Sequence, residues 1–299
     1  MNGGDGPSSA EARGAILSAG PESPGPSLPV QMSRSPAEAV GPAPIAVPAR
    51  LVGADAADVV VAPLVDLMPE LAPGLTPALR EQVRAWLAVR VWSLPRGDWP
   101  AHAVREDGLM GYLVLDGVLA RSVGLGKLAY PELLGRGDLL RPWQTELSGR
   151  LGPVEVSWQV LEPCRVAVLD SRFARMVGRW PEIVDELLSR ALSRAREMDV
   201  HMAIAQLPLL ELRLLAVLWH LADRWGEPVP GGVRVPIRLT HTLLAAMVLA
   251  RRPSVSTTMS DLAHRGLVSR RDDGWVLHGE PPTELHKLSR RDAPRSVAP

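Results

Sequence analysis

Two adjacent arginines, Arg251 and Arg252, precede a proline and a run of small hydroxyl-bearing residues in the last fifth of the chain. A guanidinium group can donate two parallel hydrogen bonds to a phosphate or to the edge of guanine, and hydroxyl groups can bond to either. Pro253 suits the first turn of a helix, where its missing N–H would have no partner anyway. These residue types predict a helix whose exposed face can contact phosphates and base edges together.

Apolar spacing predicts two short helices around this segment. Val255, Met259 and Leu262 recur at intervals of four and three, which places them on one buried face of the second helix. The solvent side of that helix then carries Arg252, Ser254, Ser256, Thr257 and Ser260. Upstream, Thr240 can cap a first helix, whose buried stripe consists of Leu243, Leu244, Met247 and Val248.

A β-hairpin is expected after the second helix. Gly266 suits the left-handed residue that ends a helix, and strand-like runs at 267–269 and 275–277 flank a turn at Asp273-Gly274. Arg270 and Arg271 would lie near the tip. Helix, tight turn, helix and hairpin together predict a winged helix-turn-helix, which places one helix in the major groove of DNA. Periodicity alone would also fit a helical hairpin that serves as a core or protein-interaction module.

This segment resembles the C-terminal DNA-binding domain of the cyclic-AMP-receptor-protein/FNR (Crp/Fnr) superfamily of bacterial transcription regulators. The resemblance rests on Leu239-Thr240, Arg252-Pro253-Ser254-Val255, Leu262 and Gly266-Leu267-Val268. It implies that Arg252 reads guanine and that Ser254 contacts phosphate. It also implies that Pro253 and Thr257 face base edges.

Two positions depart from that family's pattern. Pro253 stands where the best-known members have glutamate, so an acceptor for a cytosine amine is missing and their operator is not expected here. Leu249 stands where glycine is usual in the turn, which predicts a different turn or a strained one. The residues predicted to contact DNA are Thr240, His241, Arg251, Arg252, Pro253, Ser254, Ser256, Thr257, Arg270 and Arg271.

Strand signals dominate the middle of the chain, after two predicted helices at 64–71 and 77–89. Runs at 112–115 and 118–121 flank Asp116-Gly117 and predict a hairpin. Further strands are expected at 89–91, 139–140, 154–160 and 166–169. Many short strands at regular spacing predict a small jelly roll or barrel. In the resembled family a β-roll sensor that is similar to a cyclic-nucleotide-binding domain occupies this place.

The resemblance also covers the turn that precedes the family's ligand cassette. Gly111–Gly117 is similar to the first clear hairpin of the sensor, and Glu132–Leu139 resembles its glycine-aspartate turn. Cyclic-nucleotide binders continue with Gly-Glu and then Arg-Ser/Thr-Ala, and residues 141–150 contain neither pattern. We therefore expect that the chain retains the sensor fold but has lost the residues that bind a cyclic nucleotide.

A long helix is predicted from Pro181. Its apolar residues recur at three and four, as in two helices packed together. The residues assigned to dimerisation are Ile183, Leu187, Ala191, Ala195, Met198 and Met202. The alternative is an amphipathic helix packed only on its own domain. Dimerisation is favoured because a helix-turn-helix gains half-site readout from two-fold symmetry.

The whole chain is therefore expected to have an α+β fold. Its predicted parts are a disordered Pro/Ala/Gly-rich tail (1–60), a β-roll (61–178), a dimerisation helix (179–207), a winged helix-turn-helix (208–282) and a flexible tail (283–299).

Composition fits a regulator whose DNA contact is local. The formal net charge is zero, but residues 205–299 carry 13 Lys/Arg against 9 Asp/Glu, a balance of +4. The single cysteine, Cys164, excludes an internal disulfide framework and a cysteine-ligated iron–sulfur cluster within one chain. No apolar run approaches the length of a membrane span, so we expect a cytoplasmic protein without a membrane partner.

No enzyme is predicted. Gly124-Leu125-Gly126-Lys127 lacks the outer residues of a phosphate loop, and no catalytic triad, paired carboxylates or dinucleotide motif is found. The histidines, among them His201, His220, His241 and His264, show no recognised metal-ligand spacing, so no metal or cofactor is expected. His201 is interpreted as a packing histidine whose hydrogen bonds are satisfied.

The predicted function is a homodimeric, sequence-specific transcription regulator. Its expected partners are double-stranded DNA with a palindromic operator and, as a further candidate, RNA polymerase. Two alternatives remain open. One is a regulator of the same fold that responds to a cyclic nucleotide. The other is a scaffold that uses the winged helix for protein contacts.

Overall fold

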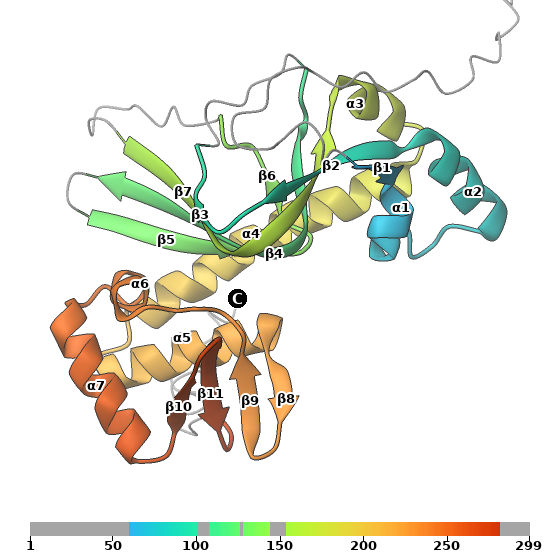
Figure 1. Cartoon of the computed structure of the whole chain (residues 1–299). Helices are drawn as coiled ribbons and strands as arrows, with labels where there is room; N and C mark the ends of the chain where they lie inside the picture. The colour runs from blue at the N-terminus through green and yellow to red at the C-terminus, as the bar shows by residue number, and fades with distance from the viewer. Residues whose placement is uncertain (1–59, 101–107, 126–127, 144–153, 282–299) are drawn as a thin grey trace, which may run out of the picture. The chain divides into compact units, whose positions relative to one another are not determined.

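The computed structural model describes residues 60–281, except 101–107, 126–127 and 144–153. Figure 1 shows the arrangement of its elements. In chain order these are β1 (Val60–Pro63), α1 (Leu64–Leu67), η2 (Pro69–Leu71), α2 (Pro77–Trp86), β2 (Ala88–Leu94), β3 (Gly97–Asp98), β4 (Gly111–Leu125), β5 (Leu128–Leu134), β6 (Leu139–Leu140), β7 (Val154–Leu169), α3 (Ser171–Val177), α4 (Pro181–Ala205), α5 (Leu210–Trp225), β8 (Glu227–Val229), β9 (Gly232–Val235), α6 (His241–Met247), α7 (Arg252–His264), β10 (Val268–Arg271) and β11 (Gly274–His278). The tails predicted over 1–60 and 283–299 lie outside the described residues, except for Val60. Most of the stretch at 141–150, where the ligand cassette is missing, also lies outside them.

The first sheet is antiparallel and forms the roll. Its strand order is β1-β2-β7-β4-β5, with β3 paired to β7 and β6 paired to β4. One set of buried residues packs this sheet against α1, α2, α3 and α4. Another set is rich in aromatic residues and includes Trp92, Trp99, Tyr112 and Trp158. Together with the helices, this sheet gives the α+β fold that the sequence predicts.

The prediction of a hairpin at Asp116-Gly117 is wrong. β4 continues through these residues and pairs with β7 from Gly111↔Leu169 to Leu125↔Val154, with register shifts between Val114 and Leu119. Gly117 has a φ of 82° and lies against the backbone of β7, where a side chain would collide with the Pro163 carbonyl. A glycine with positive φ marks either a tight turn or a bulge, and here it marks a bulge.

β7 is likewise one strand where two were expected. It runs through Glu162 and Pro163 opposite the bulge of β4, so both long strands are irregular at the same level. Arg165 pairs with Asp116 across the two strands, and its backbone N–H donates to Asp116 Oδ1 over 3.0 Å. Side-chain bonds thus secure the irregular region in which the backbone ladder is interrupted.

The two N-terminal helices are shorter than expected. The predicted helix over 64–71 divides into α1 and the 3₁₀ turn η2, because Pro69 disfavours a helical residue before it. The helix predicted over 77–89 ends at Trp86, and β2 begins at Ala88. Thr76 caps α2 by accepting a hydrogen bond from Leu79 N over 3.3 Å.

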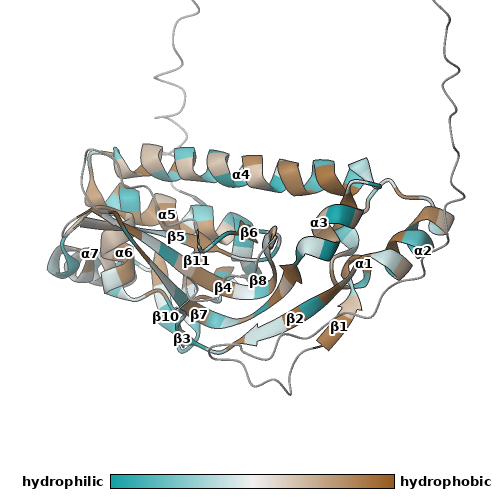
Figure 2. Cartoon of the chain, turned by 90° about the horizontal axis from the view of Figure 1, so that it is seen from above, coloured by the Kyte–Doolittle hydropathy of each residue, from teal (hydrophilic) through white to brown (hydrophobic). Residues whose placement is uncertain are grey.

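The long helix α4 matches the helix predicted from Pro181. Figure 2 shows hydrophobic and hydrophilic positions alternating along it. It is not apolar enough for a membrane: none of the helices in the described ranges combines the length and hydropathy that a transmembrane segment needs.

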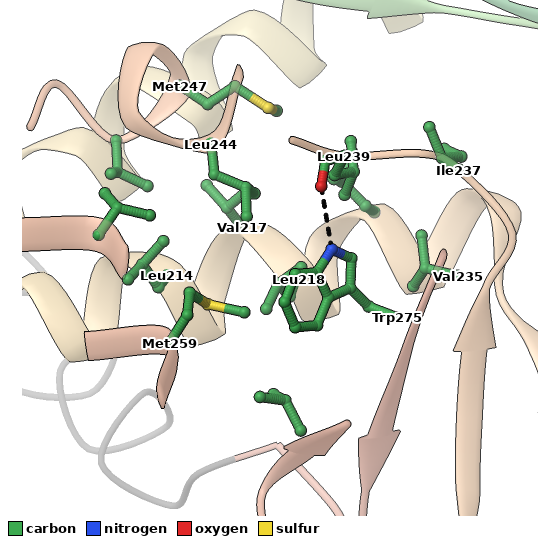
Figure 3. Packing of buried hydrophobic residues seen from close by; sticks show 14 of the residues in the cluster. Leu214, Val217, Leu218, Val235, Ile237, Leu239, Leu244, Met247, Met259 and Trp275 are labelled. Atoms are coloured by element: carbon green, nitrogen blue, oxygen red, sulfur yellow. Dashed lines mark hydrogen bonds between the residues drawn. The ribbon is translucent and has the colours of Figure 1, made fainter. Parts of the chain in front are cut away.

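The C-terminal module is built on α5 and a second antiparallel sheet, of order β10-β11-β9-β8. Figure 3 shows its core, in which α5, α6 and α7 meet the sheet around Trp275. The Trp275 indole N–H donates to Leu239 O over 3.1 Å, so the one polar atom of this large side chain is satisfied. The same cluster includes Val118, Ala120, Leu133 and Leu161 of the roll.

Candidate nucleic-acid interface

Helices α6 and α7 form the helix-turn-helix. Thr240 caps α6 as predicted, because its hydroxyl accepts a hydrogen bond from Leu243 N over 3.1 Å. In the turn, Leu249 has a φ of 50° and is 61% exposed. The turn is therefore closed with a strained left-handed residue, as expected for leucine where glycine is usual. Arg213 of α5 supports it by donating to Val248 O over 2.8 Å.

The exposed face of α7 carries the predicted contact residues. Val255, Met259 and Leu262 are buried in the core of the module, as their spacing indicates. The opposite face leaves Arg251, Arg252, Pro253, Ser254 and Thr257 exposed to solvent. Pro253 stands in the first helical turn, and Arg251 is the N-cap residue.

Two hydroxyl groups of α7 already form hydrogen bonds within their own helix. Thr257 Oγ1 donates to Pro253 O over 3.2 Å, and Thr258 Oγ1 donates to Ser254 O over 3.0 Å. Such bonds fix the rotamer and use the hydroxyl proton, so each of these side chains presents acceptor lone pairs and a methyl group outward. Ser256 is half-buried and lies 2.9 Å from His241 Nδ1.

His241 links the two helices to the wing. Its ring stacks on Trp275 with centroids 5.9 Å apart, and the Arg270 guanidinium lies over the same indole at 5.4 Å. Burial lowers the pKa of His241, and the charges of Arg270 and Arg252 lower it further. The first turn of α6, the start of α7 and the wing are therefore close enough to share one positive field.

The wing is the hairpin of β10 and β11. Its closing pair is Arg271↔Gly274, so Asp272 and Asp273 form the turn one residue before the predicted position. Asp273 accepts a hydrogen bond from Arg234 of β9 over 2.7 Å, which ties this turn to the neighbouring strand. Arg270 and Arg271 remain exposed beside the start of β11.

The structure thus brings the predicted residues onto one module, and adds two that the sequence analysis missed. Trp275 orients His241 and Arg270, and Arg213 holds the turn. The apolar neighbours of Trp275 predict a strand, but nothing in that pattern indicates that its ring contacts both His241 and Arg270. Arg213 lies on α5, 35 residues before its acceptor.

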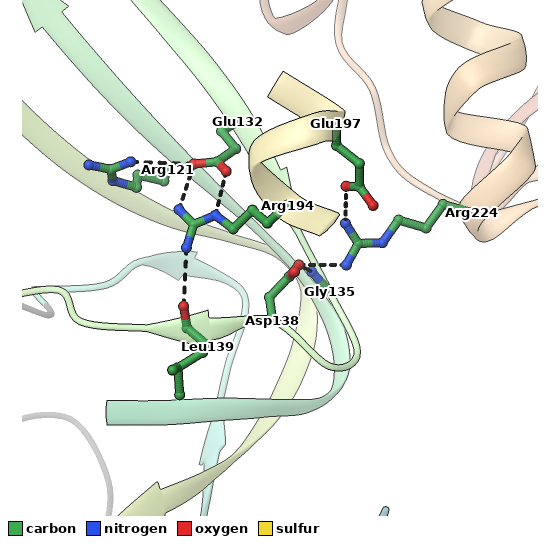
Figure 4. A network of polar contacts seen from close by, with 8 residues as sticks. All are labelled: Arg121, Glu132, Gly135, Asp138, Leu139, Arg194, Glu197 and Arg224. Atoms are coloured by element: carbon green, nitrogen blue, oxygen red, sulfur yellow. Dashed lines mark hydrogen bonds and ion pairs between the residues drawn. The ribbon is translucent and has the colours of Figure 1, made fainter. Parts of the chain in front are cut away.

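A cavity of about 420 Å³ lies between the roll and α4. Glu132 faces it and is buried, with Arg194 of α4 donating to its two carboxylate oxygens over 2.5 and 2.7 Å. Arg121 lies 3.4 Å from the same carboxylate, and Arg194 also donates to Leu139 O (Figure 4). Arg141 lines the cavity as well. Three guanidinium groups against one carboxylate leave this cavity with an excess of positive charge.

A second polar group joins the roll, α4 and α5. Arg224 of α5 donates to Asp138 and to Glu197, each over 2.6 Å (Figure 4). Asp138 is buried and also accepts from Gly135 N over 2.7 Å. Burial raises the pKa of Asp138, although Arg224 opposes this effect.

The residues assigned to dimerisation do not share one surface. Ile183 and Leu187 are buried in the core that α4 forms with the roll, so neither can meet a second chain; for these two residues the prediction needs correction. Ala191, Ala195 and Met198 line the cavity against the roll. Met202 is 59% exposed. The apolar residues of α4 therefore cover more of the helix surface than a single helix–helix contact needs, and those on its inner side pack against the roll.

The C-terminal module is similar to a known DNA-binding domain. Residues 212–279 match the Crp-like helix-turn-helix domain. The chain is 29% identical over 184 residues to the CRP-like cAMP-activated global transcriptional regulator of Mycobacterium tuberculosis. That alignment covers 58% of this chain and 77% of the relative.

Solved structures share the fold. A CooA mutant from Carboxydothermus hydrogenoformans superposes with a TM-score of 0.53 at 17% identity, covering 75% of this chain and 95% of that one. A cyclic nucleotide-binding domain containing protein from Listeria monocytogenes gives a TM-score of 0.53 at 14% identity, with 71% and 96% covered. Residues 212–279 therefore form a Crp-like helix-turn-helix domain, and the chain is similar to DNA-binding transcription regulators of the Crp/Fnr type.

Proposed function

We propose that the protein acts as a homodimer in which each chain inserts α7 into the major groove of one half of a palindromic operator. The observation that carries the proposal is the exposed face of α7. Arg251 and Arg252 stand at its start, and small polar side chains follow along it. A helix that enters the major groove with its N-terminal residues needs such a face.

In this arrangement one arginine reads a base, whereas two others contact phosphates. Arg252 makes two hydrogen bonds to a guanine, which is worth about 1–3 kcal/mol of discrimination against other bases. Arg270 and Arg271 contact phosphates and raise the affinity for any sequence. Pro253 has no side-chain acceptor, so base choice at its position rests on shape and on the methyl group of Thr257.

We assign dimerisation to the outer side of α4. Val184, Leu188 and Leu192 are 38%, 56% and 51% exposed and follow one another at four-residue intervals. Ala191, Ala195 and Met202 flank this stripe and belong to the residues first predicted. A second copy is the natural occupant, because two parallel or antiparallel helices with such spacing bury each other's apolar side chains.

The dimer is tested by sedimentation of the full chain. Leu188→Glu and Leu192→Glu should give monomers that bind an operator weakly. Leu209→Glu serves as the matched control, since Leu209 is 61% exposed but precedes α5. Monomers in the control, or dimers in both α4 variants, would refute the assignment.

We further propose that the roll does not use a cyclic nucleotide. Residues 141–150 contain neither the Gly-Glu nor the Arg-Ser/Thr-Ala that holds the ligand in the family's sensors, and Glu132 in the cavity is already paired with Arg194. One observation favours the alternative, a cyclic-nucleotide-responsive regulator: the excess of arginine in the cavity suits an anion. Calorimetry with cyclic AMP and cyclic GMP decides, because saturable binding at micromolar concentration would establish the alternative.

The second alternative is a scaffold without DNA binding. The strained, exposed Leu249 favours it, because an apolar side chain at the turn can serve a protein contact. Binding of random duplexes that weakens steeply with salt would count against it, since counterion release requires phosphate contact.

The experiment that tests the main proposal is selection of bound DNA from a random pool. A palindrome whose half-sites lie about 34–36 Å apart is expected, because two copies of α7 must follow the groove. Such a regulator would act in the cytoplasm and meet RNA polymerase at its promoters. Enrichment of no sequence would contradict specific reading by α7.

A further inference from the structure

Neighbouring hydroxyl groups of α7 are held in different ways. Thr257 and Thr258 donate their hydroxyl protons to carbonyl oxygens of their own helix, over 3.2 and 3.0 Å. Ser256 instead meets the imidazole of His241, the first residue of α6, with its Oγ 2.9 Å from Nδ1. Its partner thus lies on the other helix of the helix-turn-helix. What the Ser256 hydroxyl can offer to DNA therefore depends on His241.

The imidazole ring of His241 is held in place by Trp275. The two rings stack at 24°, with centroids 5.9 Å apart. Trp275 is itself fixed, because it is 4% exposed and its indole N–H donates to Leu239 O (Figure 3). Contacts within the module, made without DNA, therefore keep the His241 ring beside Ser256.

The surroundings of the ring decide which nitrogen carries the proton. Burial, and then the charges of Arg270 and Arg252, lower the pKa of His241, so the ring is neutral at pH 7 and has one N–H group. Nε2 is buried and has no hydrogen-bond partner among the described residues. A proton on Nε2 would be an unpaired buried donor near two positive charges, whereas a proton on Nδ1 is used in the bond to Ser256. The Nδ1–H tautomer is therefore favoured.

We propose that His241 is a positioning residue for DNA binding: its Nδ1–H donates to Ser256 Oγ, which leaves the Ser256 hydroxyl proton free to donate to a phosphate oxygen of the operator. This inference rests on the proposed function, in which α7 enters the major groove. A DNA phosphate accepts hydrogen bonds but donates none, so it needs a free donor. With the opposite tautomer, Ser256 would give its proton to His241 and present only lone pairs.

The position of Ser256 favours a phosphate over a base. Ser256 follows Arg252 by four residues, so the two lie on the same side of α7. Arg252 is exposed and can extend to a base edge, whereas the short side chain of Ser256 is half-buried beside His241. A contact with the DNA backbone fixes the position of the helix and carries no sequence information.

The first test is made on the free, full-length chain. Long-range ¹H–¹⁵N spectra at about pH 7.5 show which nitrogen of each neutral histidine is protonated. His241 should show a protonated Nδ1 and a bare Nε2. A protonated Nε2 would overturn the proposal. Because the spectrum is that of wild type, it decides even where a variant does not fold.

The second test compares affinities for a selected operator and for a scrambled duplex at one pH and one salt concentration. Ser256→Ala and His241→Ala should each weaken binding to both duplexes by roughly ten-fold, because a phosphate contact is lost whatever the sequence. The double variant should bind no more weakly than the weaker single variant. His241→Gln should restore most of the affinity, because its amide can donate to Ser256 Oγ.

Thr258→Val is the matched control. Thr258 is also half-buried on α7, but its hydroxyl proton is already used by Ser254 O, so this variant should bind both duplexes as wild type does. Wild-type affinity in Ser256→Ala, or a double variant whose loss is the sum of the single losses, would overturn the proposal. A loss confined to the operator would also overturn it, since it would place Ser256 on a base.

Arg252→Ala separates this inference from the proposed function. If Arg252→Ala lowers the ratio of the two affinities while Ser256→Ala binds like wild type, α7 is still the recognition helix and the role of His241 is refuted. If Arg252→Ala leaves the ratio unchanged, the proposed function fails, and the role of His241 in DNA binding fails with it.

Discussion

The DNA-binding module and the roll are held together by different kinds of contact. In the module, the cap of α6 and the turn after it depend mainly on residues a few positions apart, such as Thr240 with Leu243 and Ala245 with Ala250, and Arg213 adds one distant contact to the turn. In the roll, β4 pairs with β7 across some 30 to 60 residues of chain. Local contacts follow from local spacing, whereas the roll's geometry is set by partners that are distant in sequence.

The largest difference between the two regions is expected from glycine substitutions. Gly117→Ala should destabilise the roll by about 3–5 kcal/mol, since it adds left-handed strain to a collision with β7. A Cβ there would lie 2.2 Å from Pro163 O and 2.6 Å from Cys164 Cα. Urea unfolding followed by the tryptophan fluorescence of the roll measures the loss.

The matched control lies in the module. Gly266 also has a positive φ, of 68°, but an added Cβ would meet no atom within 4 Å. Gly266→Ala should therefore cost about 1–2 kcal/mol, from backbone strain alone. Equal losses in the two variants would show that the bulge of β4 is not held by contact with β7.

The same difference explains what could be predicted from the sequence. The residues of α7 and its buried face follow from a spacing of three and four, and the structure places them as expected. Asp116-Gly117 satisfies the local pattern of a hairpin, yet pairing with β7 makes it a bulge. Ile183 belongs to an apolar stripe, but a stripe alone does not indicate which side meets the roll and which side meets a partner.

The contact between the rings of His201 and His220 was missed for a related reason. Sequence motifs are recognised by spacing within one segment, and these two residues lie on different helices, 19 positions apart. Only the packing of α5 against α4 brings their rings together. The same packing hides His201 Nε2 from solvent with no hydrogen-bond partner among the described residues, so the prediction that the hydrogen bonds of His201 are satisfied is wrong.

Relief of strain in the turn is the next expected effect. Leu249→Gly should stabilise the module by about 1 kcal/mol, because glycine adopts the left-handed conformation without penalty and the lost side chain is mostly exposed. Thermal unfolding of the full chain measures it. Destabilisation instead would mean that the Leu249 side chain makes a contact worth more than its strain.

A smaller effect is expected in the pH dependence of DNA binding. In the free protein, burial and then Arg270 and Arg252 keep the pKa of His241 below its usual value, so the ring is neutral at pH 7. Bound phosphates offset the arginine charges and raise that pKa, so binding takes up a proton. Affinity should therefore rise about two- to three-fold as the pH falls from about 7.5 to about 6.

His241→Gln keeps a hydrogen-bonding side chain beside Ser256 but cannot titrate in this range. The variant should show a flatter pH profile than wild type, measured by fluorescence anisotropy at constant ionic strength. An unchanged slope would assign the proton to another group.

The most direct test of DNA reading by α7 is the ratio of affinities for a selected operator and for a scrambled duplex at one salt concentration. Arg252→Ala should lower this ratio by about 1–3 kcal/mol, or roughly 5- to 150-fold, while binding to the scrambled duplex changes little. Arg175→Ala removes the same charge from an exposed position on α3 of the roll and should leave the ratio unchanged. A ratio for Arg252→Ala equal to that of wild type would contradict the assignment of α7 as the recognition helix.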